Sequence, residues 1–449
     1  MWKFAELWQF AGARVSALQS SIGGLKSNSF LRRAGVLSGG SAVGHLFTLA
    51  VSPLLTRLYG PQDFGALGLF TSYLAVAGCA VALQYETSIV SAADESEAAY
   101  LTFAAAILAI PTSALAGVAL WVLIHFSLLG FGSINSYVSV VLSFVMCFVG
   151  IFVVLRYWNL RKQDFRQVSQ AVVVQSAARA IFQTAGGGLG LHGAGLILGE
   201  TLGRGMGMGR MFKSAWPELR GYAANFRWSE CKRVLWRNRK FPLLSLPSSV
   251  MDALCVSLSL PLLIHQYGSE SGGYYSLVWR AIALPSVLIT LAVADTFHSQ
   301  IAICARETPT EILRMFMRTS VTLLLIGVVP FLILSFWAQP LFHMIFGAQW
   351  ATSGAMAALI APWYLGQFVV NPVSRVVLVL SGQETKLIWD VLCLVSIPAV
   401  FHVARVRGME VMQTVRLLSI VSTALYCVYY AMLLRVIVKF NQKLVANAV

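Results

Sequence analysis

Charged side chains are scarce in this sequence. Asp, Glu, Lys and Arg make up 11% of the 449 residues, whereas soluble globular domains average about 25%. Hydrophobic residues make up 57%, and the mean hydropathy is +0.73. Because this balance requires apolar segments of at least about 18 residues, the sequence predicts transmembrane helices and excludes a water-soluble enzyme.

The sequence also lacks the patterns of covalent and metal chemistry. Its seven cysteines occur singly and form no C-x-x-C pair. It contains no G-x-S-x-G or H-E-x-x-H motif, and no cluster of His and carboxylates with metal-ligand spacing. We therefore expect no metal, no cofactor and no enzymatic reaction.

Apolar segments of spanning length recur along the chain. A window of about 19 residues predicts about twelve of them, at residues 34–56, 64–84, 100–126, 134–155, 168–190, 193–212, 241–264, 272–297, 316–337, 352–380, 386–404 and 411–434. The predicted fold class is an all-α polytopic membrane protein. An even number of spans places both termini on the same side of the membrane.

The distribution of basic residues gives the orientation. Ten of the 33 Lys and Arg lie between Arg204 and Lys240, whereas the loops on the opposite side hold only Arg57, Arg405 and Arg407. By the positive-inside rule both termini are cytoplasmic. The net charge of +15 is thus a topology signal, and we expect anionic lipids rather than nucleic acid as its partner.

The first 33 residues predict an amphipathic cytoplasmic segment. Apolar residues recur there at helical spacing, which indicates a helix in the membrane interface: Phe4, Leu7, Trp8, Ala11, Val15, Leu18 and Ile22.

A string repeats in the two halves of the chain. Pro53-Leu54-Leu55 with Tyr59-Gly60 returns 208 residues later as Pro261-Leu262-Leu263 with Tyr267-Gly268. Since this offset covers six spans, the repeat predicts two six-helix lobes of equal orientation with a cleft between them. The predicted units are residues 1–33, an N-lobe at 34–212, a basic cytoplasmic linker at 213–240, a C-lobe at 241–437 and a tail at 438–449.

Seven of the permanently charged residues inside predicted spans are candidates for buried charges. Each costs on the order of 2.5 to 3.5 kcal/mol at a helix centre, so we expect them to face a cavity or each other. They are Arg179, Glu200, Asp252, Arg280, Asp295, Arg375 and Asp390.

Two pairs of these charges lie at similar depth. Arg179 and Glu200 oppose each other on the fifth and sixth spans, which favours a structural ion pair. Asp252 and Arg280 lie on the next antiparallel pair, and two interpretations are open: an ion pair, or an anion-binding arginine beside a protonatable carboxylate. His45 on the first span is either a helix-packing residue or a group that contacts the substrate and titrates near neutral pH.

Glycines recur around the sixth span, at positions 199, 203, 205, 207 and 209. They follow no strand and are not followed by the lysine of a phosphate-binding loop. The spacing of Gly199 and Gly203 indicates close packing between helices.

Several strings resemble the signature of Wzx-type oligosaccharide flippases. In the first half these are Leu37-Ser38-Gly39-Gly40, the run from Pro53 to Pro61, Asp63-Phe64-Gly65, and Tyr85-Glu86 with Ile89-Val90. Looser resemblance follows in the second half, at Phe241-Pro242 with Pro247-Ser248, Arg280-Ala281 with Leu284-Pro285, and Phe346-Gly347 with Trp350 and Ala361-Pro362-Trp363.

This resemblance implies a superfamily that also holds MATE antiporters and lipid II flippases. It implies two six-helix lobes in a MATE-like V around a cationic cavity, in the bacterial inner membrane. The implied substrate is an undecaprenyl-pyrophosphate-linked oligosaccharide, moved to the periplasmic leaflet for O-antigen or exopolysaccharide assembly. A monomer and contact with polysaccharide polymerase machinery are further expectations.

Depth and charge suggest roles for individual residues. For the anionic head group we expect Arg280 first, then Arg179 and Arg57, with His45 as a further donor. Transport is expected to be coupled to H⁺ or Na⁺, with Asp252 and Glu200 as the candidate coupling residues.

Three alternatives to a flippase require different sequence features. MATE-like cation-coupled efflux of small molecules predicts an acidic cavity. An O-antigen polymerase or ligase needs a large periplasmic loop, but the longest predicted one, 338–351, is short. A scaffold for polysaccharide assembly needs no buried charge.

Overall fold

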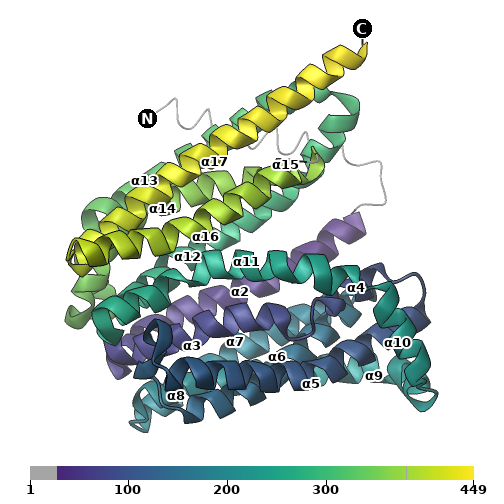
Figure 1. Ribbon diagram of the computed structural model, residues 1–449, viewed down its shortest axis with the longest axis horizontal. Coiled ribbons are helices and arrows are strands. Elements are labelled where there is room, and N and C mark those ends of the chain that lie inside the picture. The colour runs from purple at the N-terminus through teal and green to yellow at the C-terminus, as the bar shows by residue number, and fades with distance from the viewer. Residues whose placement is uncertain (1–27, 381, 449) are drawn as a thin grey trace.

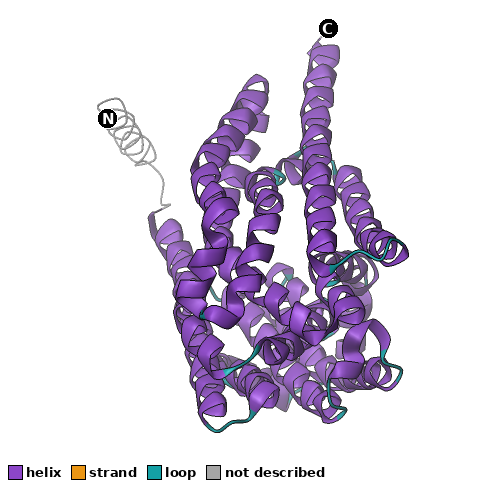
Figure 2. Ribbon diagram, turned by 90° about the vertical axis from the view of Figure 1, so that its left-hand side faces the viewer, coloured by secondary structure: helices purple, strands orange, loops and turns teal. Residues whose placement is uncertain are grey.

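The computed structural model describes residues 28–380 and 382–448, and within these ranges the chain is helical and contains no strand (Figure 2). In chain order the elements are α2 (Asn28–Leu58), α3 (Pro61–Ala80), α4 (Tyr85–Ser91), α5 (Glu95–His125), η1 (Leu128–Ser133), α6 (Tyr137–Arg161), α7 (Phe165–Gly188), α8 (His192–Gly205), α9 (Met208–Ala224), α10 (Trp228–Arg237), η2 (Phe241–Ser245), α11 (Leu246–Ser257), α12 (Ser259–Glu307), η3 (Pro309–Glu311), α13 (Ile312–Phe346), η4 (Ala348–Trp350), α14 (Ala351–Val373), α15 (Val376–Val379), α16 (Gln383–Val406) and α17 (Val411–Ala448). The amphipathic helix predicted before residue 28 lies outside the described residues.

Local sequence signals set several of these boundaries. Asp94 caps α5 by accepting a hydrogen bond from the Glu97 amide at 2.7 Å, and the Glu97 carboxylate accepts one from the Ala93 amide at 3.0 Å. A sharp turn at Gly268 divides α12, because its φ of +84° is a conformation that glycine adopts without steric cost. The span predicted at 64–84 ends early, since α3 stops at Ala80 and left-handed residues 83 and 84 precede α4.

The helices form two bundles. Figure 1 shows α5 to α8 in the lower half and α13, α14, α16 and α17 in the upper half, with α10 at the right-hand end. Within the bundles α7 packs on α2 and α8, and α14 packs on α12, α13 and α17. This arrangement confirms the predicted all-α fold of two lobes; we call the two bundles the N-lobe and the C-lobe.

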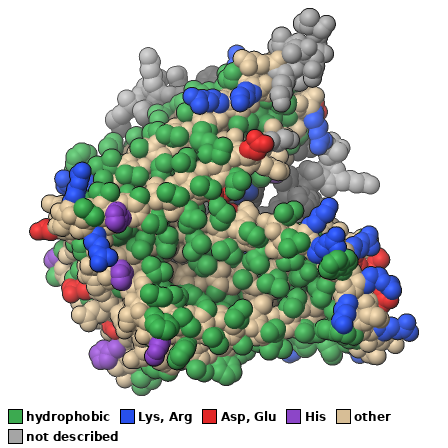
Figure 3. Space-filling model, viewed as in Figure 1, with side chains coloured by type: hydrophobic (Ala, Val, Ile, Leu, Met, Phe, Trp, Pro, Cys, Tyr) green, Lys and Arg blue, Asp and Glu red, His purple; other side chains and the backbone are tan. Residues whose placement is uncertain are grey.

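The outer surface is suited to a bilayer. Eight helices of the described chain are long and apolar enough to cross a membrane, and every predicted span overlaps one helix or consecutive helices. Hydrophobic side chains cover the middle of the face in Figure 3, while Lys and Arg gather at its right-hand edge, near α10. The protein is therefore a multi-pass membrane protein. We call the end of the bundle that carries α10 the linker end.

The repeated string makes equivalent contacts in the two lobes. The Tyr59 hydroxyl donates to the carbonyl of Gln183 at 2.6 Å, near the end of α7. The Tyr267 hydroxyl donates to the carbonyl of Met409 at 2.8 Å, in the turn between α16 and α17. Tyr59, just after α2, thus contacts the α7–α8 hairpin, and Tyr267, on α12, contacts the α16–α17 hairpin. This equivalence supports the interpretation of an internal repeat.

The repeat also closes the end of the molecule opposite the linker end. A Cβ at Gly65 would overlap the backbone of Ser269, and a Cβ at Gly273 would overlap the backbone of Pro61. Gly65 and Gly273 are 208 residues apart, as are Pro61 and Ser269, so the contact is reciprocal. The Ser269 hydroxyl also donates to the Gln62 carbonyl at 3.2 Å. The lobes therefore touch backbone to backbone at this end.

Close contact of the lobes requires glycine at these positions. We predict that Gly65→Leu destabilises the described conformation by about 1–3 kcal/mol, the usual cost of overpacking. Gly78→Leu is the matched control, since Gly78 lies on the same helix with open space around it. Chemical unfolding of the purified protein measures both variants, and equal stability of the two would contradict the close contact.

Candidate functional site

Two helices of the N-lobe bring buried charges together. Glycines on α8 lie very close to α7: a Cβ at Gly199 would overlap Gln183, a Cβ at Gly203 would overlap Arg179, and a Cβ at Gly195 would be in tight contact with Gly186. This is the close packing that the glycine spacing predicted. It places the Arg179 guanidinium 3.3 Å from the Glu200 carboxylate, so the predicted ion pair is present.

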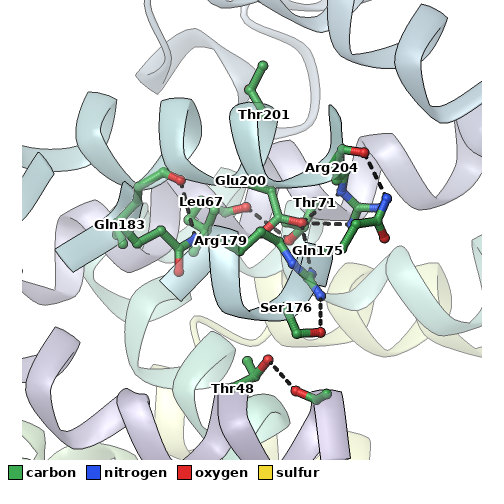
Figure 4. Close-up of polar contacts among 12 residues, drawn as sticks. Thr48, Leu67, Thr71, Gln175, Ser176, Arg179, Gln183, Glu200, Thr201 and Arg204 are labelled. Carbon is green, nitrogen blue, oxygen red and sulfur yellow. Dashed lines mark hydrogen bonds and ion pairs between the residues drawn. The ribbon is translucent and has the colours of Figure 1, made fainter. Parts of the chain in front are cut away.

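Glu200 also binds Arg204, an arginine counted above only among the basic residues that give the orientation. Arg204 reaches the same carboxylate oxygen at 2.8 Å, because α8 continues through Gly205 and places residues 200 and 204 one turn apart. Figure 4 shows both guanidinium groups converging on Glu200, whose exposed fraction is 3%. Arg179 also donates to the Ser176 hydroxyl at 3.3 Å. The spacing of Glu200 and Arg204 is a signal that could have revealed this pair.

Arg280 joins this group from the C-lobe. It lies on α12, twelve residues beyond the Gly268 turn, which is roughly 18 Å of helix rise and near the middle of a hydrocarbon layer about 30 Å thick. Its guanidinium lies 5.9 Å from the ring centre of Phe64 on α3. Its buried Nη1 has no hydrogen-bond partner among the residues that the structure describes.

A small cavity lies between the two lobes at this point. Arg179 and Arg280 both line it, together with Thr48, Val51, Leu55, Ser176, Ala180 and Gln183. Its volume of about 10 Å³ has room for about one water molecule. We call Arg179, Arg204, Arg280 and Glu200 the arginine cluster. Three positive charges face one negative charge there, so the lobe interface is cationic within the membrane.

The other predicted anion-binding residues lie further out. His45 is partly exposed on α2, one turn before the cavity residue Thr48. Arg57 is exposed in the last turn of α2 and is not part of the cavity wall in the described chain. The anion-binding role of both residues stays a prediction.

Asp252 does not pair with Arg280, so the interpretation as an ion pair was wrong. Its carboxylate lies 2.6 Å from the ammonium group of Lys386, which also contacts Asp390 at 2.7 Å. Similar depth did not bring Asp252 and Arg280 together, because a helix also fixes the direction in which each side chain points. Lys386 was missed since it stands at the start of a predicted span.

This second charged group lies in a large cavity of the C-lobe. The cavity has a volume of about 800 Å³ and is lined by residues of α11, α12, α14, α15, α16 and α17. Asp252, Lys386, Asp390 and Arg375 contribute its charges. The structure thus has two candidate sites, a cationic one between the lobes and a larger, charge-balanced one within the C-lobe.

Known proteins support the transporter fold. Residues 54–355 match a family model described as polysaccharide biosynthesis protein. The chain is similar to an inward-facing MATE multidrug transporter of the MOP superfamily, with 14% identity, a TM-score of 0.65, and coverage of 89% of this chain and 96% of that one. It is also similar to the lipid II flippase MurJ in an inward closed conformation, with 14% identity, a TM-score of 0.64, and coverage of 93% and 92%.

A third similar structure is a MOP-superfamily transporter from Pyrococcus furiosus, whose binding pocket is described as having reverse polarity. It shows 14% identity and a TM-score of 0.54, with coverage of 91% of this chain and 96% of that one. No curated protein matches the chain.

The chain therefore shares the fold of polytopic membrane transporters of known structure. The chain belongs to the polysaccharide biosynthesis protein family, and its fold is that of the MOP superfamily.

Glu200 neutralises part of a buried positive charge. We predict that Glu200→Gln lowers the free energy of unfolding by on the order of 3 kcal/mol, because Arg179 and Arg204 lose their shared counter-ion. Glu311→Gln is the control, since it removes an exposed pair with Arg314 that is expected to contribute little. Denaturant titration of the purified protein compares the variants, and an unchanged stability of Glu200→Gln would refute this role.

Proposed function

We propose that the protein translocates undecaprenyl-pyrophosphate-linked oligosaccharides from the cytoplasmic to the periplasmic leaflet of the bacterial inner membrane. The product would serve O-antigen or exopolysaccharide assembly. The observation that carries this proposal is the arginine cluster, because a cationic site in the hydrocarbon zone matches a diphosphate. Membership of the polysaccharide biosynthesis protein family supports the same substrate class.

Such a substrate needs a protein path through the membrane. Each unsatisfied polar group in hydrocarbon costs several kcal/mol, so neither the sugars nor the diphosphate crosses unaided. A hydrated cleft between the lobes would carry the head group while the polyprenyl tail stays in lipid. Closure of the lobes at Gly65 and Gly273 is consistent with a cleft that admits substrate from the linker end.

Arginine suits the diphosphate for geometric reasons. Its planar guanidinium offers paired donors and stays charged at every physiological pH. Arg280 is the leading candidate, because its buried Nη1 lacks a partner in the described chain. Arg179 faces the same cavity from the other lobe. We assign Glu200 the positioning of Arg179 and Arg204, since two ion pairs favour its ionised form.

The linker end would face the cytoplasm. Trp228 and Trp236 are 51% and 70% exposed there, and Arg239 lies over the Trp236 ring at 4.3 Å. Tryptophan beside basic residues is typical of a membrane surface that carries anionic lipids. The membrane potential would then assist export, since each negative charge leaving the cytoplasm gains about 2.3 kcal/mol per 100 mV.

Resetting the empty cationic cleft requires a second driving force. We propose that entry of H⁺ or Na⁺ supplies it through Asp252, whose side chain is 52% exposed in the C-lobe cavity while it contacts Lys386. Binding of a cation to Asp252 would weaken the ion pair between Asp252 and Lys386. The Lys386 ammonium group would then pair with Asp390 only. The charge of the C-lobe would thus depend on the coupling ion.

Loss of Arg280, the leading candidate for binding the anionic head group, should abolish transport. We predict that Arg280→Ala in a deletion strain gives no surface polysaccharide and leaves lipid-linked oligosaccharide on the cytoplasmic face. Arg280→Lys should restore transport partly, because it returns the charge without the paired donors. Arg314→Ala, at an exposed arginine on α13, is the control and should behave as the wild type.

The competing functions give different results in this experiment. A normal amount of surface polysaccharide in the Arg280→Ala strain would refute the assignment of Arg280 to the anion site. Drug resistance that depends on the chain, with unchanged lipid-linked oligosaccharide, would favour small-molecule efflux instead.

Removing the coupling carboxylate should change the ion dependence of transport. In reconstituted vesicles, we expect Asp252→Asn to transport slowly and to lose its response to a pH or Na⁺ gradient, because the neutral amide does not change charge. Glu270→Gln, which alters an exposed carboxylate outside the cavity, should keep the response. An unaltered gradient response of Asp252→Asn would exclude this residue.

A further inference from the structure

The C-lobe cavity has an aromatic lining in addition to its charges. Trp279 of α12 contacts Tyr364 of α14, with ring centres 6.3 Å apart. Trp389 of α16 lies 5.0 Å from Tyr426 and stacks on Tyr429 at 4.4 Å, both on α17. All five residues line the cavity.

Some of these rings present free surface to the cavity. Trp279, Trp363 and Tyr426 are half-buried, whereas Trp389 and Tyr429 are buried. A flat ring fixed by its neighbours loses little conformational freedom when a ligand packs on it. The lining therefore provides rigid apolar platforms.

Polar groups lie among the platforms. Gln367, Asn371 and Ser374 follow one another along α14 and the turn after it at helical spacing, and all three line the cavity. The Tyr364 hydroxyl is buried, and no residue of the described ranges forms a hydrogen bond with it. The cavity thus combines apolar faces with amide and hydroxyl groups that bind other hydroxyls.

The charges of the cavity cancel. Asp252 and Asp390 are matched by Lys386 and Arg375, so the lining carries two negative and two positive charges. Such a site selects neither an organic cation nor a diphosphate by its net charge. It fits a ligand that is polar, neutral and rich in hydroxyl groups.

We propose that the C-lobe cavity binds the glycan of the lipid-linked substrate, with Trp279 and Trp363 packing against sugar rings and Gln367 and Asn371 binding their hydroxyls. This inference rests on the proposed function and adds a second, separate subsite to the arginine cluster. The volume of about 800 Å³ lies in the range of roughly 300–1,000 Å³ typical of small-molecule sites.

The polyprenyl tail is a poorer occupant of this cavity. An apolar chain would leave the amides of Gln367 and Asn371 and the charges around Lys386 without water or ligand partners. A sugar satisfies both kinds of surface, since its ring carries apolar C–H faces and a rim of hydroxyls.

Binding measurements on the purified full chain test this assignment. The probes are bare undecaprenyl pyrophosphate and the lipid-linked oligosaccharide extracted from a strain that lacks the transporter. We expect the wild type to bind the glycosylated lipid at least about tenfold more tightly, which corresponds to about 1.4 kcal/mol. The double variant Trp279→Ala/Trp363→Ala should lose most of this preference and bind the bare lipid as before.

Matched variants separate the two subsites. Trp337→Ala, at a tryptophan that is 59% exposed outside the cavity, should keep the full preference, and Trp363→Phe should keep most of it. Arg280→Ala should weaken the binding of both lipids by the same factor. Unchanged bare-lipid binding by the double alanine variant shows that it is folded.

The outcomes distinguish failure of this inference from failure of the proposed function. Equal binding of the two probes by the wild type, or a preference that survives in the double variant, would overturn the glycan subsite. If neither lipid binds the wild type, the proposed function itself is wrong.

Discussion

The free-energy cost of placing charged side chains in the hydrocarbon layer determines where the buried arginines of this structure lie. Arg179, Arg204 and Arg280 cannot face lipid. Arg179 and Arg204 bind one carboxylate, and Arg280 faces Arg179 across the cavity where the two lobes meet. Glu200 neutralises only part of their charge, and the remainder is available to an anion. Because Arg280 comes from one lobe and Arg179 from the other, separation of the lobes would change the site. The same groups thus link substrate binding to conformation.

The internal repeat sets how each lobe is held together and how the two lobes contact each other. Tyr59 and Tyr267 hold each lobe together through equivalent hydrogen bonds, while Gly65 and Gly273 let the backbones of the two lobes approach closely. Side chains also join the lobes, since α12 packs along α3 and the Trp350 ring of the C-lobe contacts Phe64 of the N-lobe. Two lobes that each keep their own internal hydrogen bonds suit motion as rigid bodies.

Much of the architecture could be predicted from the sequence, whereas the site could be predicted only in part. Hydropathy located the helices, since every predicted span overlaps them, and the 208-residue offset revealed the repeat. The Arg179 and Glu200 pair followed from their similar depth on consecutive spans. Depth alone failed for Asp252, which pairs with Lys386 rather than Arg280. The aromatic cavity could not be foreseen, because in an apolar sequence tryptophans of a cavity, a core and a lipid-facing surface have the same pattern.

The decisive measurement is an experimental structure with bound undecaprenyl pyrophosphate. We expect the diphosphate to lie between Arg280 and Arg179, with both guanidinium groups within hydrogen-bond distance of its oxygens. A diphosphate bound elsewhere, with Arg280 still enclosed at a closed lobe interface, would contradict it.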